Sequence, residues 1–172
     1  MKLDKVVIIT HGQICAQPRT VKQAISLSKK YEVSVIYCPM SPWGDQFDNT
    51  IISENPHIRW IRVGAHPTEN PILYFLAKLR RKMWQNYYRI FGSSFHSALK
   101  SFSLYSQDLL NEARKHEADI IIGHNLGSIR AVVETSKKYN ALSCFDFEDY
   151  HRGEISKKNI EFQLIKKIVQ YM

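Results

Sequence analysis

The chain has 172 residues, a length that suits one domain with a core large enough to fold without disulfides or metal. Lys and Arg number 24 against 16 Asp and Glu, and the formal net charge of +8 favours anionic partners: phosphorylated substrates, lipid head groups or nucleic acid. The three cysteines lack C-x-x-C spacing, which excludes a zinc ribbon or a dithiol redox motif and predicts a reducing, cytoplasmic compartment. No apolar run suits a signal peptide or a membrane span, so we expect a protein that is soluble or lies on a membrane surface.

In the first half of the chain, a β-branched run at residues 6–10 predicts a buried strand that ends at His11-Gly12. A helix from Arg19 and an apolar run at 33–37 complete a β-α-β unit. Residues 39–56 are rich in Pro, Gly, Asp and Asn, which predicts a long surface loop with at most a short strand or turn. Residues 58–63 predict a third strand, exposed on one side because its arginines alternate with apolar residues.

In the second half, a helix should begin at Asn70-Pro71 and end at Gly92, and another should follow it to about residue 116. We expect the first of these helices to cover the sheet with Ile72, Phe75, Leu76, Leu79, Met83, Tyr87 and Ile90, and the second to face inward with Leu99, Phe102, Tyr105, Leu109 and Ala113. Buried strands at 119–122 and 141–145, each followed by a helix, complete the pattern. This alternation predicts a single α/β domain with a doubly wound, mainly parallel Rossmann-like sheet and helices on both faces.

Polar residues follow three of the predicted strands. They are His11-Gly12-Gln13, Gly123-His124-Asn125, and the stretch from Asp146 to His151, which holds three carboxylates and a histidine. In an open α/β sheet the ligand lies beyond the carboxyl ends of the strands, where the strand order reverses. We therefore expect these three loops to form one site.

The same residues resemble a known family. The strand followed by His-Gly, the helix start Gln-Pro-Arg-x-x-Lys, and the stretch ADIIIGHNLGSIRAVVETSKKYNALSCFDFEDYHRGE are similar to the N-terminal domain of GT-B glycosyltransferases, above all the retaining family 4. The resemblance covers nearly the whole chain and is strongest over residues 118–154. It implies an acceptor-side domain, the N-terminal part of a longer two-domain enzyme.

The resemblance also implies an activity. It is the transfer of a hexose, with retention and without a metal or cofactor, from a nucleotide-sugar donor to a glycan or lipid-linked acceptor, as in cell-envelope polysaccharide synthesis. Asp146 falls where the family places a catalytic residue that contacts the transferred sugar. The donor is held mainly by a second domain that this chain lacks, so we expect the isolated chain to be inactive.

The sequence allows two roles for several of these site residues. Asp146 either stabilises positive charge on the sugar or caps the following loop. Glu148 and Asp149 either orient Asp146 and bind acceptor hydroxyls or are surface acids before a helix. A metal site that joins His151 to these acids is disfavoured because a second histidine is missing from the cluster.

The other two loops are equally ambiguous. His11, Gly12 and Gln13 match a loop that lies between the two domains of the family, where glycine allows close approach to a phosphate or acceptor. Arg19 either meets an acceptor phosphate or solvates a helix start. His124 is a candidate acid-base group or a satisfied strand-end residue, and Asn125 binds substrate or caps the next helix.

Between Glu69 and Asp108 the sequence contains no acidic residue. Basic and aromatic residues there predict a helix that lies on an anionic membrane, with Lys78, Arg81, Lys82, Trp84 and Arg89 at its surface. Nucleic-acid binding is disfavoured because no recognisable binding motif accompanies the charge. A rival from another class is a non-catalytic flavodoxin-like or binding-protein-like module for a small anionic ligand.

Overall fold

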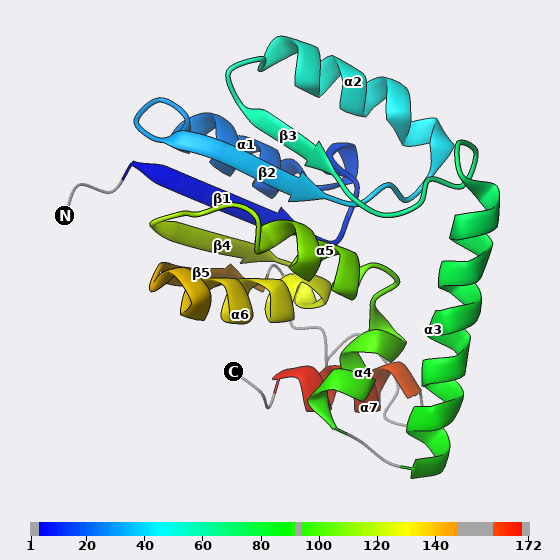
Figure 1. Ribbon diagram of the computed structural model, residues 1–172. Helices are drawn as coiled ribbons and strands as arrows, with labels where there is room; N and C mark the ends of the chain where they lie inside the picture. Colours follow the sequence, from blue (N-terminus) through cyan, green and yellow to red (C-terminus); the bar gives the residue numbers. More distant parts are fainter. Residues whose placement is uncertain (1–3, 92–93, 148–159, 170–172) are drawn as a thin grey trace.

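The computed structural model describes residues 4–91, 94–147 and 160–169. It is an α/β fold built on a five-stranded, all-parallel sheet (Figure 1). The strands are β1 (Lys5–Thr10), β2 (Glu32–Tyr37), β3 (Arg59–Arg62), β4 (Ile120–His124) and β5 (Leu142–Asp146), and their order in the sheet is β3-β2-β1-β4-β5. The predicted fold class is confirmed.

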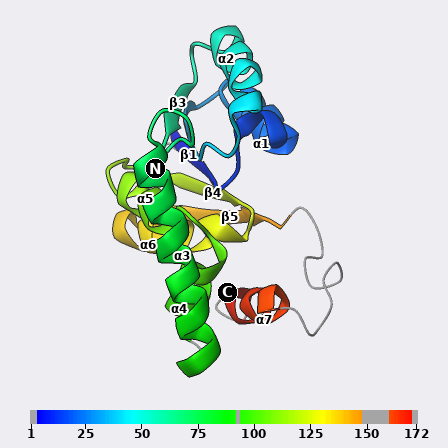
Figure 2. The same cartoon turned by 90° about the vertical axis from the view of Figure 1, so that its right-hand side faces the viewer.

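Helices cover both faces of the sheet. In chain order they are α1 (Pro18–Leu27), α2 (Asp45–Glu54), α3 (Pro71–Phe91), α4 (Phe95–Phe102), α5 (Ser106–Ala113), α6 (Ile129–Tyr139) and α7 (Ile160–Val169), with short 3-10 turns η1 (Ile14–Ala16), η2 (Pro42–Gly44) and η3 (Leu126–Ser128). Helices α1 and α2 lie on one face, and α5 and α6 lie on the other (Figures 1 and 2).

Alternation along the strands divides the core between these faces. On β1, Val7 and Ile9 pack on the α5 and α6 side, whereas Val6 and Ile8 pack on the α1 and α2 side. Both sides of β1 are therefore apolar, which is why its sequence is a continuous β-branched run. A third buried cluster joins α4, α6 and α7 below the sheet, and it contains Ala98, Leu99, Leu126, Ile129, Leu164, Ile165 and Ile168.

The long loop predicted at 39–56 is wrong, because this segment contains α2. Pro42 and Gly44 belong to the 3-10 turn η2, which leads directly into the helix. Proline is compatible with the first turn of a helix. The carboxylates of Asp45 and Asp48 lie in the first turn of α2, where they interact favourably with the positive end of the helix dipole. The helix packs Ile51 and Ile52 toward the core.

The helix expected between about 94 and 116 is instead two helices, α4 and α5. The chain leaves the helix at Ser103, which has an extended backbone, and re-enters one at Ser106. The residues predicted to face inward do so: Leu99, Tyr105, Leu109 and Ala113 are buried and Phe102 is partly buried. The apolar period therefore predicts the inward side of both helices correctly, but no Pro or Gly marks the break between them.

The prediction that β5 is a buried strand is also wrong. Strand β5 is an edge of the sheet, and Leu142 on it is 60% exposed. Among the described residues, no helix covers Leu142 and Cys144, because α1 lies over β1 and β2 instead. An apolar run alone does not distinguish an edge strand from a central one.

Helix α3 lies differently from the prediction. It stands along the edge to which β2 and β3 point, beside α4, instead of lying across a face of the sheet (Figures 1 and 2). All seven apolar residues expected to cover the sheet are between 46% and 75% exposed. The side of α3 that packs inward carries Tyr74, Ala77, Trp84, Gln85 and Tyr88. Two faces of this helix are apolar or aromatic, and the sequence pattern did not show which one meets the protein.

Candidate active site at the carboxyl edge of the sheet

The strand order creates a switch point between β1 and β4. From β1 the chain moves outward to β2 and β3, and then returns to β4 on the other side of β1. In open α/β sheets the connections on the two sides of such a point diverge, and ligands bind in the crevice between them; in this chain the corresponding place is at the carboxyl ends of β1 and β4. Thr10, His124 and Asp146 are partners in the register there, so all three lie in one row across β1, β4 and β5.

His124 and Asp146 lie side by side in this row. Nδ1 of His124 is 3.7 Å from Oδ2 of Asp146, and Nε2 is 2.7 Å from Oε1 of Gln23 on α1. The His124 side chain is only 1% exposed. The imidazole is therefore held from both sides and lies behind Asp146, not in contact with solvent.

Asp146 is the accessible member of the pair. Its side chain is 38% exposed, and Nη1 of Arg19 lies 3.9 Å from its Oδ1 atom. A carboxylate between a guanidinium and an imidazole, with one side open to water, can accept hydrogen bonds or stabilise positive charge on a ligand.

The loops after β1 and β4 are joined to each other. Asn125 donates a hydrogen bond from Nδ2 to Oε1 of Gln17 (2.7 Å), and the Gln17 side chain packs against Gly12. Gly127 packs equally closely on the ring of His11. The structure thus brings His11, Gly12 and Asn125 together beside the row of strand ends.

Asn125 does not cap the following helix with its side chain. It occupies the N-cap position of η3, but no side-chain capping hydrogen bond forms there. Its backbone has φ 64° and ψ 145°, a positive-φ conformation that is uncommon for residues other than glycine, and the side chain turns to Gln17. Of the two roles considered for Asn125, the side-chain cap is therefore not the one that the structure shows.

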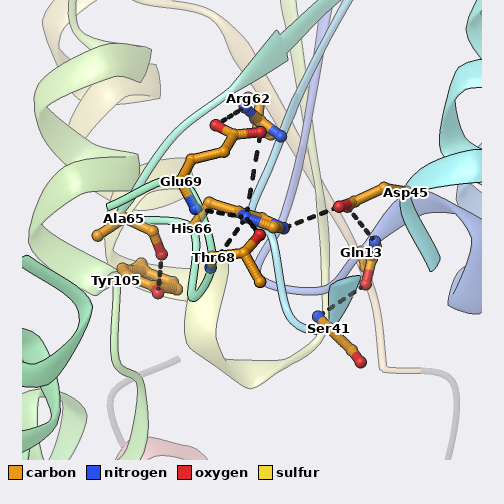
Figure 3. Close-up of polar contacts among 9 residues, drawn as sticks. All are labelled: Gln13, Ser41, Asp45, Arg62, Ala65, His66, Thr68, Glu69 and Tyr105. Carbon is orange, nitrogen blue, oxygen red and sulfur yellow. Dashed lines mark hydrogen bonds and ion pairs between the residues drawn. The ribbon is translucent and has the colours of Figure 1, made fainter. Parts of the chain in front are cut away.

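Gln13 points away from the crevice. Its side chain is buried, accepts a hydrogen bond from the backbone N–H of Ser41 (3.0 Å) and donates one to Oδ1 of Asp45 (3.3 Å), as Figure 3 shows. Gly44 packs against the same amide. Gln13 thus holds the start of α2, and the predicted substrate-binding role is not supported by its position.

Asp45 belongs to a second polar network, centred on His66 (Figure 3). Nδ1 of His66 accepts hydrogen bonds from the backbone N–H groups of Thr68 (3.3 Å) and Glu69 (3.4 Å), and Nε2 lies 3.0 Å from Oδ2 of Asp45. Nε2 of His66 makes no hydrogen bond within the described residues, so its contact with Asp45 is one of proximity. Glu69 in turn pairs with Arg62 of β3.

This network sets where α3 begins. The carbonyl of His66 accepts the N–H of Asn70, and the Tyr105 hydroxyl donates to the carbonyl of Ala65 (2.6 Å). Nearby, burial and then the charge of Asp48 raise the pKa of Tyr37 to about 12, so this phenol stays protonated at neutral pH. His66 at the centre of the network is buried, whereas Arg62 and Glu69 at its outer end are exposed. We interpret the network as structural because its residues join α2, β3 and the start of α3.

Two residues of the site, Gln17 and Gln23, were not predicted from the sequence. They flank Arg19 at the start of α1, and Gln23 is one turn beyond Arg19 on the same side of the helix. That i, i+4 spacing of polar residues, on the helix after the first strand, is a signal that could have found Gln23. Glu148, Asp149 and His151 lie outside the described residues.

The predicted membrane-surface residues separate into two groups. Lys78, Arg81, Lys82 and Arg89 are exposed along α3. Trp84 is half-buried instead, and the ammonium group of Lys100 lies 4.4 Å from its ring centroid. Within the described ranges, no group of three or more His, Cys, Asp or Glu side chains is arranged to hold a metal, and no helix there is long and apolar enough to cross a bilayer.

No protein-family model matches the chain, and no curated protein matches it. Among solved structures, it is similar to the C-terminal domain of the PF1911 hydrogenase from Pyrococcus furiosus, with a TM-score of 0.50, 16% identity, and coverage of 86% of this chain and 93% of that one. At such low identity the likeness concerns the fold alone. The fold is Rossmann-like.

A UDP-glycosyltransferase is also among the structural neighbours of this Rossmann-like chain. It is UGT89C1 of Arabidopsis thaliana, solved in complex with UDP. The TM-score is 0.49 at 13% identity, and the match covers 97% of this chain but 42% of that one. This chain therefore spans less than half the length of that neighbour.

Proposed function

We propose that this chain is the acceptor-side domain of a glycosyltransferase that moves a sugar from a nucleotide-sugar to a glycan or lipid-linked acceptor, with retention and without a metal. The observation that carries the proposal is the position of Asp146. Its carboxylate is the accessible end of the row at the switch point, and Arg19 and His124 hold it there. The resemblance of residues 118–154 to family 4 enzymes supports the same assignment.

The chemistry assigned to Asp146 is electrostatic. In the transfer, the bond between the anomeric carbon and the diphosphate breaks, and the acceptor oxygen bonds to that carbon while its proton passes to the departing diphosphate. Positive charge develops on the sugar ring between these events. A preorganised carboxylate beside the ring stabilises that charge.

His124 acts through Asp146 in this proposal. Because its ring is buried between Gln23 and Asp146, it cannot exchange a proton with a ligand directly. It is a positioning residue that keeps the carboxylate in place. Arg19 and Asn125, at the rim of the crevice, are the candidates for contact with the acceptor.

The donor belongs to a second domain in this proposal. The diphosphate of the leaving group needs basic residues and helix N-termini opposite Asp146, and the resemblance assigns these to a domain that this chain does not contain. The 172-residue chain should then fold and bind acceptor without transferring sugar.

The test compares two proteins. One is the 172-residue chain, and the other is the product of the complete reading frame that encodes it. Both are incubated with a panel of nucleoside diphosphate sugars and a membrane extract, and released nucleoside diphosphate is measured. We expect release from the complete product alone. Turnover by the 172-residue chain would overturn the two-domain proposal. If the complete product shows no turnover with any of the donors, the assignment as a glycosyltransferase is wrong.

Attachment to an anionic membrane is part of the same proposal. The outward face of α3 carries a continuous apolar stripe, defined as Ile72, Phe75, Leu76, Leu79, Met83, Tyr87 and Ile90. Lys78, Lys82 and Arg89 flank it on one side. An exposed apolar face with a cationic border suits an interface rich in anionic lipids. The enzyme would then meet a lipid-linked acceptor at the surface where the acceptor resides.

The rival module for a small anionic ligand is less well supported. The strand order β3-β2-β1-β4-β5 differs from the flavodoxin order, in which the first strand is followed in the sheet by the third. It matches the first five strands of the nucleotide-binding order instead.

A further inference from the structure

Two small cavities lie side by side beneath α3, close to the carboxyl edge of the sheet. The first has a volume of about 140 Å³, and His11, Lys78 and Phe102 contribute to its walls. The second has a volume of about 110 Å³ and is lined in part by Arg80 and Lys100. Arg81, Ser103 and Leu104 line both cavities and form the wall between them.

The charge around these cavities is all of one sign. The first is lined by Lys78 and Arg81, the second by Arg80, Arg81 and Lys100, and neither lining contains a carboxylate. Arg80 pairs with Asp108 at 3.6 Å. Within the described residues Arg81 has no hydrogen bond or ion pair, so its five N–H donors are available to an anion.

Ser103 supplies a second, independent sign of a ligand. The residue is 4% exposed, and its Oγ atom has no hydrogen-bond partner in the described part of the chain. A buried hydroxyl without a partner costs about 1–3 kcal/mol. Ser103 lines both cavities, so a small rotation of its side chain would let Oγ donate a hydrogen bond to a ligand oxygen there and remove this cost.

We propose that the two cavities form a binding site for a phosphate group, held by Arg81 with the help of Lys78 and Ser103. Phosphate offers several acceptor oxygens and up to two charges, which matches a guanidinium, an ammonium and a hydroxyl better than a carboxylate does. Because His11 lines the first cavity and also belongs to the crevice loop after β1, the phosphate lies next to the candidate active site.

Resting on the proposed function, this site assigns the acceptor to the class of phosphorylated molecules. Two sources share that chemistry. One is a soluble sugar phosphate, and the other is a lipid whose phosphate headgroup enters the site while its chains meet the apolar stripe of α3.

The first experiment measures the binding of inorganic phosphate and pyrophosphate to the 172-residue chain by calorimetry, at about 0.01 M ionic strength, where charge is least screened. Arg81→Gln should weaken binding by about tenfold or more, since a charged hydrogen bond contributes about 1.5–3 kcal/mol. Ser103→Ala should weaken binding roughly threefold without lowering the melting temperature, because it removes a hydroxyl that lacks a partner in the free protein.

The matched control is Lys82→Gln. This variant removes the same charge one residue along α3, but Lys82 lines neither cavity. Its affinity should stay within about twofold of the original, as expected for an exposed charge. Equal loss from Arg81→Gln and Lys82→Gln would overturn the site, and so would a failure of the original chain to bind either anion. If Arg81→Gln does not fold, unchanged binding by Ser103→Ala overturns the proposal.

A second experiment separates the two sources. Binding to vesicles of phosphatidylglycerol is measured with and without pyrophosphate. If pyrophosphate weakens vesicle binding by the original chain but not by Arg81→Gln, the site binds a lipid headgroup. If pyrophosphate does not change vesicle binding by the original chain, the site binds a soluble phosphate. These results do not depend on turnover. If the complete product binds phosphate selectively but transfers no sugar, the proposed function is wrong and the phosphate site still stands.

Discussion

Nδ1 of His124 lies 3.7 Å from Oδ2 of Asp146, and the two residues are direct partners in the register of β4 and β5. Because the backbone pairing of two strands fixes this contact, it does not depend on a flexible loop. The buried histidine and the accessible carboxylate form a rigid pair at the sheet edge. Changes that leave the sheet intact but move neighbouring side chains should therefore affect the crevice before they affect the fold.

Gly127→Ala should disturb the loop after β1. A Cβ atom at Gly127 would lie 2.5 Å from Cγ of His11, so the imidazole ring would have to move. Overpacking of this kind costs about 1–3 kcal/mol of folding free energy. Urea unfolding of the variant measures this cost.

Gly12→Ala is the matched control for that change. Its Cβ atom would meet the amide end of the Gln17 side chain at 2.8 Å, and this end can rotate away. The expected cost is roughly that of one hydrogen bond, about 1 kcal/mol, because Gln17 would release Asn125. A larger loss of stability from Gly12→Ala than from Gly127→Ala would contradict this description of the loops.

Asp119 should make stability depend on pH. Its carboxylate accepts the backbone N–H groups of Lys5 and Asp4, each at 2.9 Å, and these bonds lower its pKa below the ordinary value of 3.8. A lowered pKa means that the stabilisation is present above pH 4 and is lost as the pH falls through the folded-state pKa. Asp119→Ala should therefore be less stable than the original chain at pH 7.

The stability difference between the two proteins should shrink as the pH is lowered below about 4. Unfolding by urea over a series of pH values measures it. A difference that stays constant from pH 7 to pH 3 would show that these two hydrogen bonds do not depend on the charge of Asp119.

The apolar stripe of α3 should bind anionic vesicles. Leu79 and Met83 are both exposed, so the double change to serine should leave the unfolding free energy within about 0.5 kcal/mol of the original. A long apolar side chain contributes about 1.5–3 kcal/mol when fully buried, so we expect vesicle affinity to fall roughly tenfold or more. Co-sedimentation with vesicles of phosphatidylglycerol measures it.

Leu142→Ser is the control for the vesicle experiment. Leu142 is 60% exposed but lies on β5, away from α3, and the change removes one exposed apolar side chain where the double change removes two. It should leave vesicle binding unchanged. Equal losses from the two variants would mean that α3 is not the contact surface.

Much of the fold could be predicted because several strands carry strong local signals. The β-branched run of β1 and the apolar run of β4 are buried on both sides, so each reads as a central parallel strand. The polar residues that end them, His11 and His124, follow from the same boundaries. The predicted convergence of Asp146 with the loop residues after β1 and β4 needed only the rule that parallel strands share one carboxyl edge.

The directions in which side chains and helix faces point could not be predicted from the sequence. Gln13 and Gly12 are neighbours, yet one packs against α2 and the other faces Gln17. Helix α3 has two apolar or aromatic sides, and the contact with α4 decides between them. Helix α2 was missed because Pro42 and Gly44 mark both loops and helix starts, and only the position of the following acids separates the two.

The most direct test of the central claim is the kcat of Asp146→Asn in the product of the complete reading frame, followed as nucleoside diphosphate release. Loss of a preorganised charge at the reacting sugar should lower kcat about 10²–10³-fold with little change in KM. Asp119→Asn makes the same chemical change at the opposite edge of the sheet, before β4, and should leave kcat unaltered. An Asp146→Asn protein that keeps the original kcat would contradict the role of Asp146 and with it the proposed active site.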